Sequence, residues 1–294
     1  MIRALTIYLL ALLASGAGAQ ETTSALPSLL GDDAEGFPKA IEPRVFDFPA
    51  DHGPHPEFRN EWWYVTGNLD AEDGRRFGFE LTFFRFALTP SMPDQGSNWR
   101  TNQVYIAHLA LTDARGQRFL VDERYSRGAL GLAGAEADPF RVWIDDWQIA
   151  ARPGVNTRWV LTAASDDFAL NVELKALKPP ALNGDAGLSQ KSDKPGSASY
   201  YYSMTRWATD GSVTIGDQSL DVRGLSWLDR EWSSSALDDG QQGWDWFALQ
   251  LDDGSELMVY NLRRTDGSQD RNSAGTFIAA DGAYEHLVAD DIRI

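Results

Sequence analysis

Residues 51–86 carry the pattern that most restricts the fold, because they read as a leading loop followed by a β-hairpin. Apolar residues occupy every second position from 77 to 83, and aromatic and β-branched residues dominate 62–69. Asp73-Gly74 separates the two runs. Period two on both sides of such a turn is typical of antiparallel strands. The sequence therefore predicts a hairpin whose alternate side chains fill a core.

A similar pattern returns near the end of the chain. Both copies open on an acid beside tryptophans, turn at Asp-Gly and close on arginine, in the segments 61–85 and 244–263. Hairpins share composition, so one similarity could arise by chance. The common order of acid, Trp, turn and Arg makes an internal duplication our interpretation.

The remaining chain also reads as short strands. About eight runs lie within 43–177 and a second set within 200–294, with no helical period in either. The segment 178–199, rich in Pro, Gly, Lys and Ser, is predicted to link them. With 294 residues and 43% hydrophobic content, the chain can fill two cores. We expect an all-β protein with antiparallel barrels or sandwiches in these two domains, preceded by a flexible arm at 20–42.

The first nineteen residues indicate export. Arg3 precedes an apolar run at 4–13, and Ala17-Gly18-Ala19 supplies a cleavage site after Ala19, as in a signal peptide. We expect a periplasmic or secreted protein with no membrane span in the mature chain. There is no cysteine, which excludes disulfides and a lipid-modified cysteine. The net charge of −17 argues against nucleic acid and anionic lipid surfaces as partners.

Six short motifs occur in order along the chain: DHGPHPE at 51–57, EWWY at 61–64, LTFFR at 81–85, SYYYS at 199–203, WLDREW at 227–232 and GWDWF at 243–247. Together they resemble the AttH-type family, which includes the hydroxyneurosporene synthases (carotenoid 1,2-hydratases). The resemblance implies two lipocalin-like β-barrel domains, and an ABC-type transporter as a partner, because such proteins are associated with transporter gene clusters. Family members usually continue to a Tyr-Trp-Glu-Gly segment and beyond, so we expect the second domain to be incomplete at the C-terminus here.

The strongest candidate site lies around 227–232, together with Trp244-Asp245-Trp246 and Tyr260. Strand alternation places Asp229 and Glu231 on one face and Arg230 and Trp232 on the other. A carboxyl kept neutral by an apolar pocket can donate a proton to an alkene, and aromatic faces can stabilise the resulting cation. The alternative is a structural belt of Asp, Arg and Glu ion pairs between two domains.

Comparison with the hydratases separates the candidate residues that match the hydratase motif from those that differ from it. Their corresponding motif resembles Asp-His-Asn-Trp, followed downstream by Tyr and Asp two positions apart. Trp232 and Tyr260 match, whereas Arg230 stands at the His position and Leu262 at the Asp position. Arginine cannot act as an acid or base near neutral pH, which argues against carotenoid hydration. Our candidates are Asp229, Glu231, Trp232 and Tyr260 as catalytic residues, and Arg230, Trp244, Asp245 and Trp246 as ligand-binding residues.

Other polar residues have simpler interpretations. His52 and His55 could belong to a metal site with neighbouring carboxylates, but we favour a hydrogen-bonded loop and expect neither metal nor cofactor. His108 is expected to be a hydrogen-bonded core histidine, with a pocket acid or base as the alternative. Arg85 and Arg263 are expected to stack on Trp at a barrel mouth.

Two functions remain open on these grounds. One is a carrier that binds a hydrophobic small molecule, isoprenoid or polyketide-like, in service of an envelope transporter. The other is a hydratase- or cyclase-like enzyme in which Asp229 or Glu231 is the acid. Loss of the hydratase His favours the carrier, while Trp232, Tyr260 and the clustered carboxylates keep the enzyme open.

Overall fold

The structure is a computed structural model that describes residues 34–92, 97–235 and 237–294. The expected signal peptide lies outside these residues. Within the described ranges, none of the helices has both the length and the apolar character needed to cross a membrane. Two short 3-10 helices, η1 (Ala50–His52) and η2 (Ala289–Asp291), accompany a structure otherwise made of strands.

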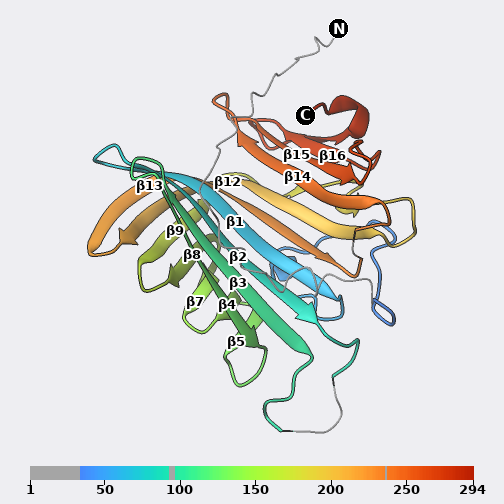
Figure 1. Cartoon of the computed structure of the whole chain (residues 1–294), viewed down its shortest axis with the longest axis horizontal. Coiled ribbons are helices and arrows are strands. Elements are labelled where there is room, and N and C mark those ends of the chain that lie inside the picture. Colours follow the sequence, from blue (N-terminus) through green and yellow to red (C-terminus); the bar gives the residue numbers. More distant parts are fainter. Residues whose placement is uncertain (1–33, 93–96, 236) are drawn as a thin grey trace.

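A 13-stranded antiparallel sheet forms most of the molecule and curls into a nearly closed barrel, as Figure 1 shows. Its main path runs β4-β3-β2-β1-β13-β12-β9-β8-β7-β6-β5, while β10 and β11 pair with β12. The strands are β1 (Asn60–Ala71), β2 (Arg76–Ala87), β3 (Gln103–Asp113), β4 (Arg118–Arg127), β5 (Ala133–Ala137), β6 (Phe140–Ile144), β7 (Trp147–Arg152), β8 (Val155–Ala164), β9 (Phe168–Ala176), β10 (Ala181–Leu182), β11 (Leu188–Gln190), β12 (Ala198–Ile215) and β13 (Gln218–Ser233).

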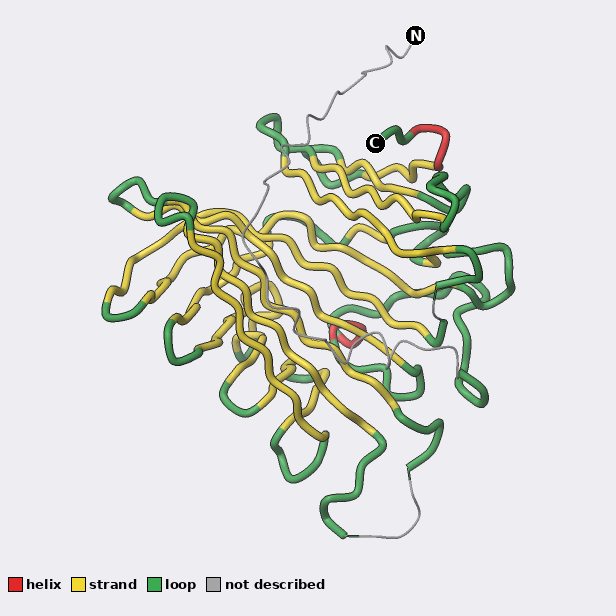
Figure 2. The backbone as a smooth tube through the Cα atoms, viewed as in Figure 1, coloured by secondary structure: helices red, strands yellow, loops and turns green. Residues whose placement is uncertain are grey.

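The second sheet has four antiparallel strands and lies beside one end of β12 and β13, apart from β5–β9 (Figure 2). It contains β14 (Gln241–Gln250), β15 (Glu256–Arg264), β16 (Ala274–Ile278) and β17 (Tyr284–Val288). Its inner face packs on Tyr201 and Trp227 of the large sheet through Met258, Tyr260 and Leu262. The expected all-β fold is confirmed.

Both predicted hairpins form. β1 and β2 pair through the Asp73-Gly74 turn, and β14 and β15 pair through Asp253-Gly254. Gly74 and Gly254 have φ of 79° and 83°, in the left-handed region that glycine enters without steric cost. The first hairpin lies in the large sheet and the second in the small one.

The segment 178–199 does not separate two sheets. It contains β10 and β11, and Lys178 donates from Nζ to a carboxylate oxygen of Glu256 at 2.7 Å. The strand that follows, β12, has 18 residues and a register shift between Met204 and Trp207. Because β12 pairs with β9 and β13 pairs with β1, the large sheet continues across the expected domain boundary.

The interior of the barrel is filled by side chains. Phe83 and the indoles of Trp63, Trp159 and Trp207 have no exposed surface, and they lie within one continuous apolar cluster. Residues 34–48, which include part of the expected flexible arm, pack on the outside and at one end of this barrel. Phe37 and Ala40 are buried, and Phe46 meets Trp232 edge to face at 5.5 Å. The barrel is therefore a packed core.

Candidate functional site

The central strand β13 divides the predicted site residues between its two faces. Arg230 lies opposite Trp63 of β1 and Tyr202 of β12, whose side chains point into the barrel. Asp229 lies opposite Tyr64 and Ser203, which face the second sheet. Successive residues of a strand point to opposite faces, so neighbours in this sequence belong to different environments. The eight candidate residues are not one site.

Inside the barrel, Arg230 forms an ion pair with Glu61. The same carboxylate also binds Arg85, and all three side chains have no exposed surface. The guanidinium of Arg230 lies over the Trp63 ring at 4.1 Å. Burial would raise the pKa of Glu61, but the two guanidinium groups hold that pKa well below its usual range. This network contradicts the expected belt in which Arg230 pairs with Asp229 and Glu231.

Trp232 also belongs to the interior. Its ring stacks on His55 at 3.8 Å with an angle of 5° between the planes. His55 accepts a hydrogen bond at Nδ1 from Arg230 and donates from Nε2 to Asp51, at 3.1 and 3.0 Å. The loop that leads into β1 is thus hydrogen-bonded around the barrel end, as the non-metal interpretation predicted. In the described part of the chain, no group of three or more His, Asp or Glu is arranged to hold a metal ion.

On the other face, Asp229 is 4% exposed and accepts three hydrogen bonds. The donors are Ser203 Oγ, Trp227 Nε1 at 3.0 Å, and the hydroxyl of Tyr201. Burial raises the pKa of Asp229 to about 7 and outweighs these donors, each of which favours the ionised form. Asp229 therefore exchanges its proton close to neutral pH.

Glu231, two residues further along β13, has a different environment. Lys191 Nζ lies 3.0 Å from its carboxylate, and Ser199 Oγ donates to the same oxygen. Burial would lower the pKa of Lys191, but the charge and hydrogen bond of Glu231, together with the charges of Tyr260 and Asp229, raise it. Lys191 therefore stays charged and pairs with Glu231.

Two aromatic residues of the second sheet close this side. Tyr260 forms a hydrogen bond with Ser189 through their hydroxyls at 3.1 Å, and Lys191 Nζ lies 4.8 Å above its ring. Trp246 donates from Nε1 to the hydroxyl of Tyr201 at 3.3 Å and meets Tyr64 edge to face at 5.4 Å. Asp229, Glu231, Tyr260 and Trp246 are thus brought together as predicted, without Arg230 and Trp232.

The other two predicted ligand-binding residues lie at the margin. Trp244 is 49% exposed, and Asp245 accepts from Arg263 at 2.6 Å. The expected stacking of Arg85 and Arg263 on Trp is wrong. Each of these arginines instead pairs with the acid that opens its own hairpin, Arg85 with Glu61 and Arg263 with Asp245.

His108 is also placed differently from its expected core position. Its side chain is 27% exposed on the outside of the large sheet, where Nε2 lies 2.7 Å from Glu123. The interior face of β3 carries Tyr105, Ala107, Leu109 and Leu111 instead. These residues at odd-numbered positions of β3 therefore fill the core, and the even-numbered positions from 104 to 110, which include His108, face outward.

Sequence reasoning missed the partners that define the two carboxyls. Lys191 lies in the expected linker, and Ser199, Tyr201 and Ser203 lie in the Ser-Tyr-Tyr-Tyr-Ser motif, which was used for family resemblance alone. The period of the strand contains a signal: 199, 201 and 203 share a face and pair with 233, 231 and 229. Their register could not be read from the sequence without knowing that β12 pairs with β13.

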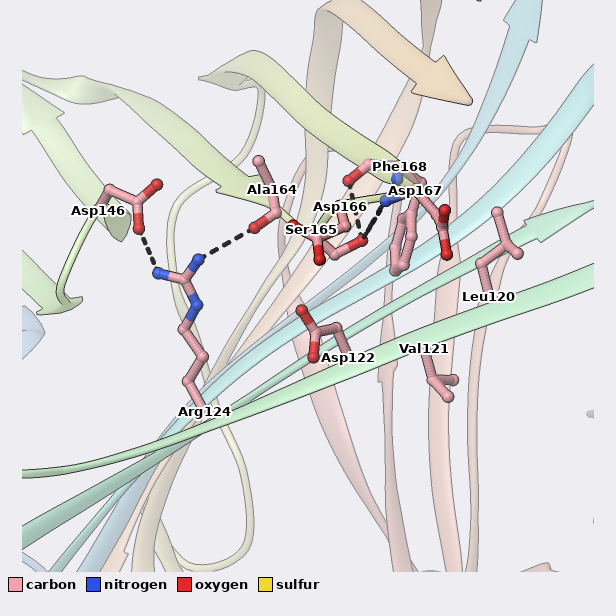
Figure 3. Close-up of a pocket in the computed structure, with 10 residues that line it drawn as sticks. All are labelled: Leu120, Val121, Asp122, Arg124, Asp146, Ala164, Ser165, Asp166, Asp167 and Phe168. Carbon is pink, nitrogen blue, oxygen red and sulfur yellow. Dashed lines mark hydrogen bonds and ion pairs between the residues drawn. The ribbon is translucent and has the colours of Figure 1, made fainter. Parts of the chain in front are cut away.

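Two surface hollows lie away from these carboxyls. The larger, of about 540 Å³, lies between β4 and the turns at 145–146 and 165–167. Figure 3 shows Arg124 reaching across it to the carboxylate of Asp146 and the carbonyl of Ala164. The other, of about 320 Å³, lies between 269–271 and 288–290. Neither is lined by a residue that contacts Asp229.

The family model described as AttH-like matches residues 39–294. The chain belongs to the AttH-like family. The crystal structure of an AttH protein from Nitrosomonas europaea is similar, with 33% sequence identity and a TM-score of 0.76 over 86% of this chain and 76% of that chain. This likeness identifies the large barrel and second sheet as the lipocalin-like fold of AttH structures.

A second solved structure shares the fold of this AttH-like chain. Kievitone hydratase from Nectria haematococca has a TM-score of 0.61 with 12% identity, over 86% of this chain and 72% of that chain. No curated protein sequence matches the chain.

Proposed function

We propose that this AttH-like protein binds an apolar, unsaturated small molecule beside Asp229 and transfers a proton to it, as a hydratase or cyclase does. The observation that carries the proposal is the buried carboxyl of Asp229, whose pKa of about 7 leaves much of it protonated at neutral pH. A general acid works best when its pKa lies near the working pH. The surrounding Trp227 and Tyr201 supply aromatic surface rather than opposing charge.

The two carboxyls divide the roles of acid and ion partner. Glu231 is paired with Lys191, whereas the pKa of Asp229 is raised. Environments that separate the pKa values of neighbouring acids are typical of acid and base assignments in enzymes. Arg230, which could have neutralised Asp229, is bound to Glu61 on the other face of the sheet.

The reaction balances without further reagents except water. Asp229 gives its proton to one alkene carbon, so a C–H bond forms, the π bond breaks and the other carbon becomes cationic. The faces of aromatic rings such as Trp227 and Trp246 stabilise that cation. Water then adds through oxygen and returns a proton to the Asp229 carboxylate, which completes hydration. Attack by a second alkene of the same substrate would instead form a C–C bond that closes a ring and leave the positive charge on a ring carbon. Loss of a proton from the neighbouring carbon to the Asp229 carboxylate would then form a new double bond and complete cyclisation.

The comparisons support the reaction class without defining a substrate. Kievitone hydratase is a hydratase with the same fold, and the motifs around 227–232 and 260 resemble those of carotenoid hydratases. Arg230 at the hydratase His position argues for a different substrate or a different arrangement of acid and base. We therefore propose an apolar isoprenoid or polyketide-like alkene as the substrate class.

The test is proton transfer from solvent. Purified protein would be incubated in D₂O with a panel of apolar polyenes, and products would be analysed by mass spectrometry for deuterium bonded to carbon. We expect Asp229→Asn to abolish incorporation while keeping the fold. Asp70→Asn, which alters an exposed acid that pairs with Arg76, is the matched control and should retain it. Undiminished incorporation by Asp229→Asn would disprove the proposal.

A non-catalytic carrier is the second candidate, favoured by how closely Asp229 is covered. With 4% of its surface exposed, it meets a ligand only after side chains around it move. The half-exposed Trp244 offers an apolar contact for such a ligand. A carrier would retain a co-purified molecule in native mass spectrometry, release it unchanged and incorporate no deuterium in the same experiment.

Export and an ABC-type transporter partner are further proposals. They are supported by the N-terminal sequence and by the family resemblance. Fractionation of expressing cells, with intact mass of the exported form, tests cleavage after Ala19; mature protein beginning before that position argues against it. Cross-linking in the envelope, followed by identification of captured membrane proteins, tests the partner, and capture of none from the transporter class would contradict it.

A further inference from the structure

A continuous chain of hydrogen bonds joins Asp229 to the second sheet. Ser203 Oγ on β12 donates to Oδ1 of Asp229. The amide nitrogen of Asn183, directly after β10, lies 2.9 Å from Ser203 Oγ, and its amide oxygen lies 2.7 Å from Oγ1 of Thr276 on β16. Ser203 and Thr276 have no exposed surface, and Asn183 is 1% exposed. Each link of the chain is therefore a hydrogen bond between side chains shielded from solvent.

Backbone contacts hold Asn183 in place independently of its amide group. The strand before it, β10, pairs with β12 at Leu182 and Tyr202. The backbone nitrogen of Asn183 then donates to the carbonyl oxygen of Tyr201 at 3.0 Å. The side-chain amide can therefore be replaced without removing the contacts that position residue 183.

The indole of Trp227 sets the direction of donation along this chain. An indole N–H donates and does not accept, and Trp227 Nε1 lies 3.0 Å from Oδ1 of Asp229. Oδ1 is therefore an acceptor. Ser203 donates its single hydroxyl proton to the same oxygen, so the oxygen of Ser203 accepts from the amide nitrogen of Asn183. Thr276 completes the order by donating to the amide oxygen.

Two donors at Oδ1 leave the proton of the neutral carboxyl to the other oxygen, Oδ2. A proton on Oδ1 would meet the N–H of Trp227, so Oδ1 is the carbonyl oxygen of the neutral acid. The hydroxyl of Tyr201 also donates to Asp229. Because a protonated carboxyl keeps acceptor capacity, this third donor does not displace the proton from Oδ2. The hydrogen bonds thus make the two oxygens of Asp229 unequal.

We propose that Ser203 and Asn183 are positioning residues that, together with Trp227, hold Oδ1 of Asp229 as the carbonyl oxygen and place the transferable proton on Oδ2. The inference rests on the proposed function, in which Asp229 is the catalytic residue. In the transfer step the O–H bond at Oδ2 breaks as the C–H bond of the product forms. The added water then returns a proton to Oδ2, so both transfers use the same oxygen and the hydrogen bonds at Oδ1 stay in place.

The ionisable groups around Asp229 lie outside this chain of hydrogen bonds. They are Tyr64 of β1, Lys191 between β11 and β12, Tyr201 of β12, Glu231 of β13 and, through Lys191, Tyr260 of β15. Substitutions at Ser203 and Asn183 leave all of them present. A change in the titration of Asp229 in such variants therefore reports the hydrogen bonds at Oδ1.

The experiment follows the C=O stretch of protonated Asp229 without substrate, by infrared difference spectroscopy at a series of pH values, with Asp229→Asn to assign the band. Ser203→Ala removes a donor that favours the ionised form, so the titration midpoint should rise by about one pH unit. The band should also move to higher wavenumber, because the carbonyl accepts one hydrogen bond fewer. Ser203→Thr keeps the hydroxyl and should restore both values.

Asn183→Leu tests action through Ser203, because residue 183 does not bond to Asp229. It should shift the midpoint and the band in the same direction as Ser203→Ala and by less. Ser226→Ala is the matched control. Ser226 is 1% exposed and its hydroxyl bonds to that of Thr209 at 2.7 Å, so the change removes a buried hydrogen bond of the same kind away from Asp229. Its midpoint and band should equal those of the wild type.

The outcomes separate this inference from the proposed function. An unchanged midpoint in Ser203→Ala would overturn the inference, and so would a lowered one, which would show that Ser203 accepts from Asp229. A midpoint that moves in Ser203→Ala but stays at the wild-type value in Asn183→Leu would overturn the role of Asn183. In each case Asp229 would remain the acid. A wild-type protein with no protonated Asp229 band between pH 5 and 7 would overturn both proposals.

Stability is measured alongside by urea unfolding. A merely structural role for Ser203 predicts that Ser203→Ala and Ser226→Ala lose stability alike and that neither moves the Asp229 band. If Ser203→Ala fails to fold, Asn183→Leu decides by the direction of its midpoint shift.

Discussion

Arg230 binds Glu61 inside the barrel, on the opposite side of β13 from the carboxyl that precedes Arg230 in the sequence. Because both side chains are fully buried, each depends on the other for compensation of its charge. The pairing explains how an arginine can occupy the centre of an acidic motif without neutralising the acids beside it. It also separates the two faces of β13, because the Arg230–Glu61 pair lies inside the barrel while Asp229 and Glu231 face the second sheet.

Arg230→Met should destabilise the fold by about 3–5 kcal/mol, because removing one partner leaves Glu61 with only Arg85 to balance its charge. Urea unfolding followed by circular dichroism at pH 7 measures this. Arg76→Met, which breaks an exposed 3.0 Å pair with Asp70, is the matched control and should cost less than about 1 kcal/mol. Equal losses in the two variants would contradict the assignment of Arg230 to a buried network.

Asp229→Asn should change the pH dependence of stability in a defined direction. A carboxyl whose pKa rises from 3.8 to about 7 on folding is destabilising above pH 3.8, because only the unfolded state ionises there at first. The wild type thus loses up to roughly 4 kcal/mol from this group between pH 4 and pH 7. The variant lacks that loss and should gain stability relative to wild type as pH rises. Parallel stability curves from pH 4 to pH 8 would show that the Asp229 pKa is not raised.

His52 should affect the pH dependence of stability in the opposite direction. Burial, helped by the charge of Arg230, lowers the pKa of His52 to about 4. Between pH 6.5 and pH 4 this histidine is protonated in the unfolded chain but stays neutral in the folded protein. The free energy of unfolding therefore falls by roughly 3 kcal/mol as the pH is lowered through this range. His52→Gln should flatten this part of the curve. A variant that loses stability on acidification as steeply as wild type would rule out a buried, neutral His52.

Phe83→Ala tests whether ligands enter the barrel. Phe83 has no exposed surface and lies in the apolar cluster, so its truncation should cost about 3–5 kcal/mol. If ligand binds beside Asp229, affinity measured by native mass spectrometry should stay the same at a temperature where the variant is folded. Trp246→Leu, on the opposite side of the sheet, should weaken binding. A reversed pattern would place the ligand in the barrel.

The hairpins were the most predictable part of the fold because their information is local. The Asp-Gly turns and the period-two run at 77–83 fix the two hairpins, within two residues at the ends of β1. The pairing of β13 with β1 joins residues 151 to 173 positions apart, and no local pattern specifies it. The boundary at 178–199 was drawn from composition. Composition cannot show that β12 returns to the first sheet.

Part of the site could be predicted from the sequence, because strand alternation is also local information. Alternation correctly separated Asp229 and Glu231 from Arg230 and Trp232. It could not say which face is interior, because both carry tryptophan, and so it could not predict that Arg230 finds Glu61. Lys191 could not be predicted as a site residue, because its contact with Glu231 depends on the pairing of β11 with β12, which brings its loop to Glu231.

Because the two faces of β13 carry different side-chain networks, the number of residues in this strand is constrained. One residue inserted or deleted between Gly224 and Asp229 would rotate every later side chain to the opposite surface. The guanidinium of Arg230 would then face Tyr201 and Trp227, and a carboxylate would enter the barrel beside Glu61. Natural variation in this stretch should therefore proceed by substitution. Any tolerated insertion should add two residues, or lie before β13, on the far side of the turn at 216–217.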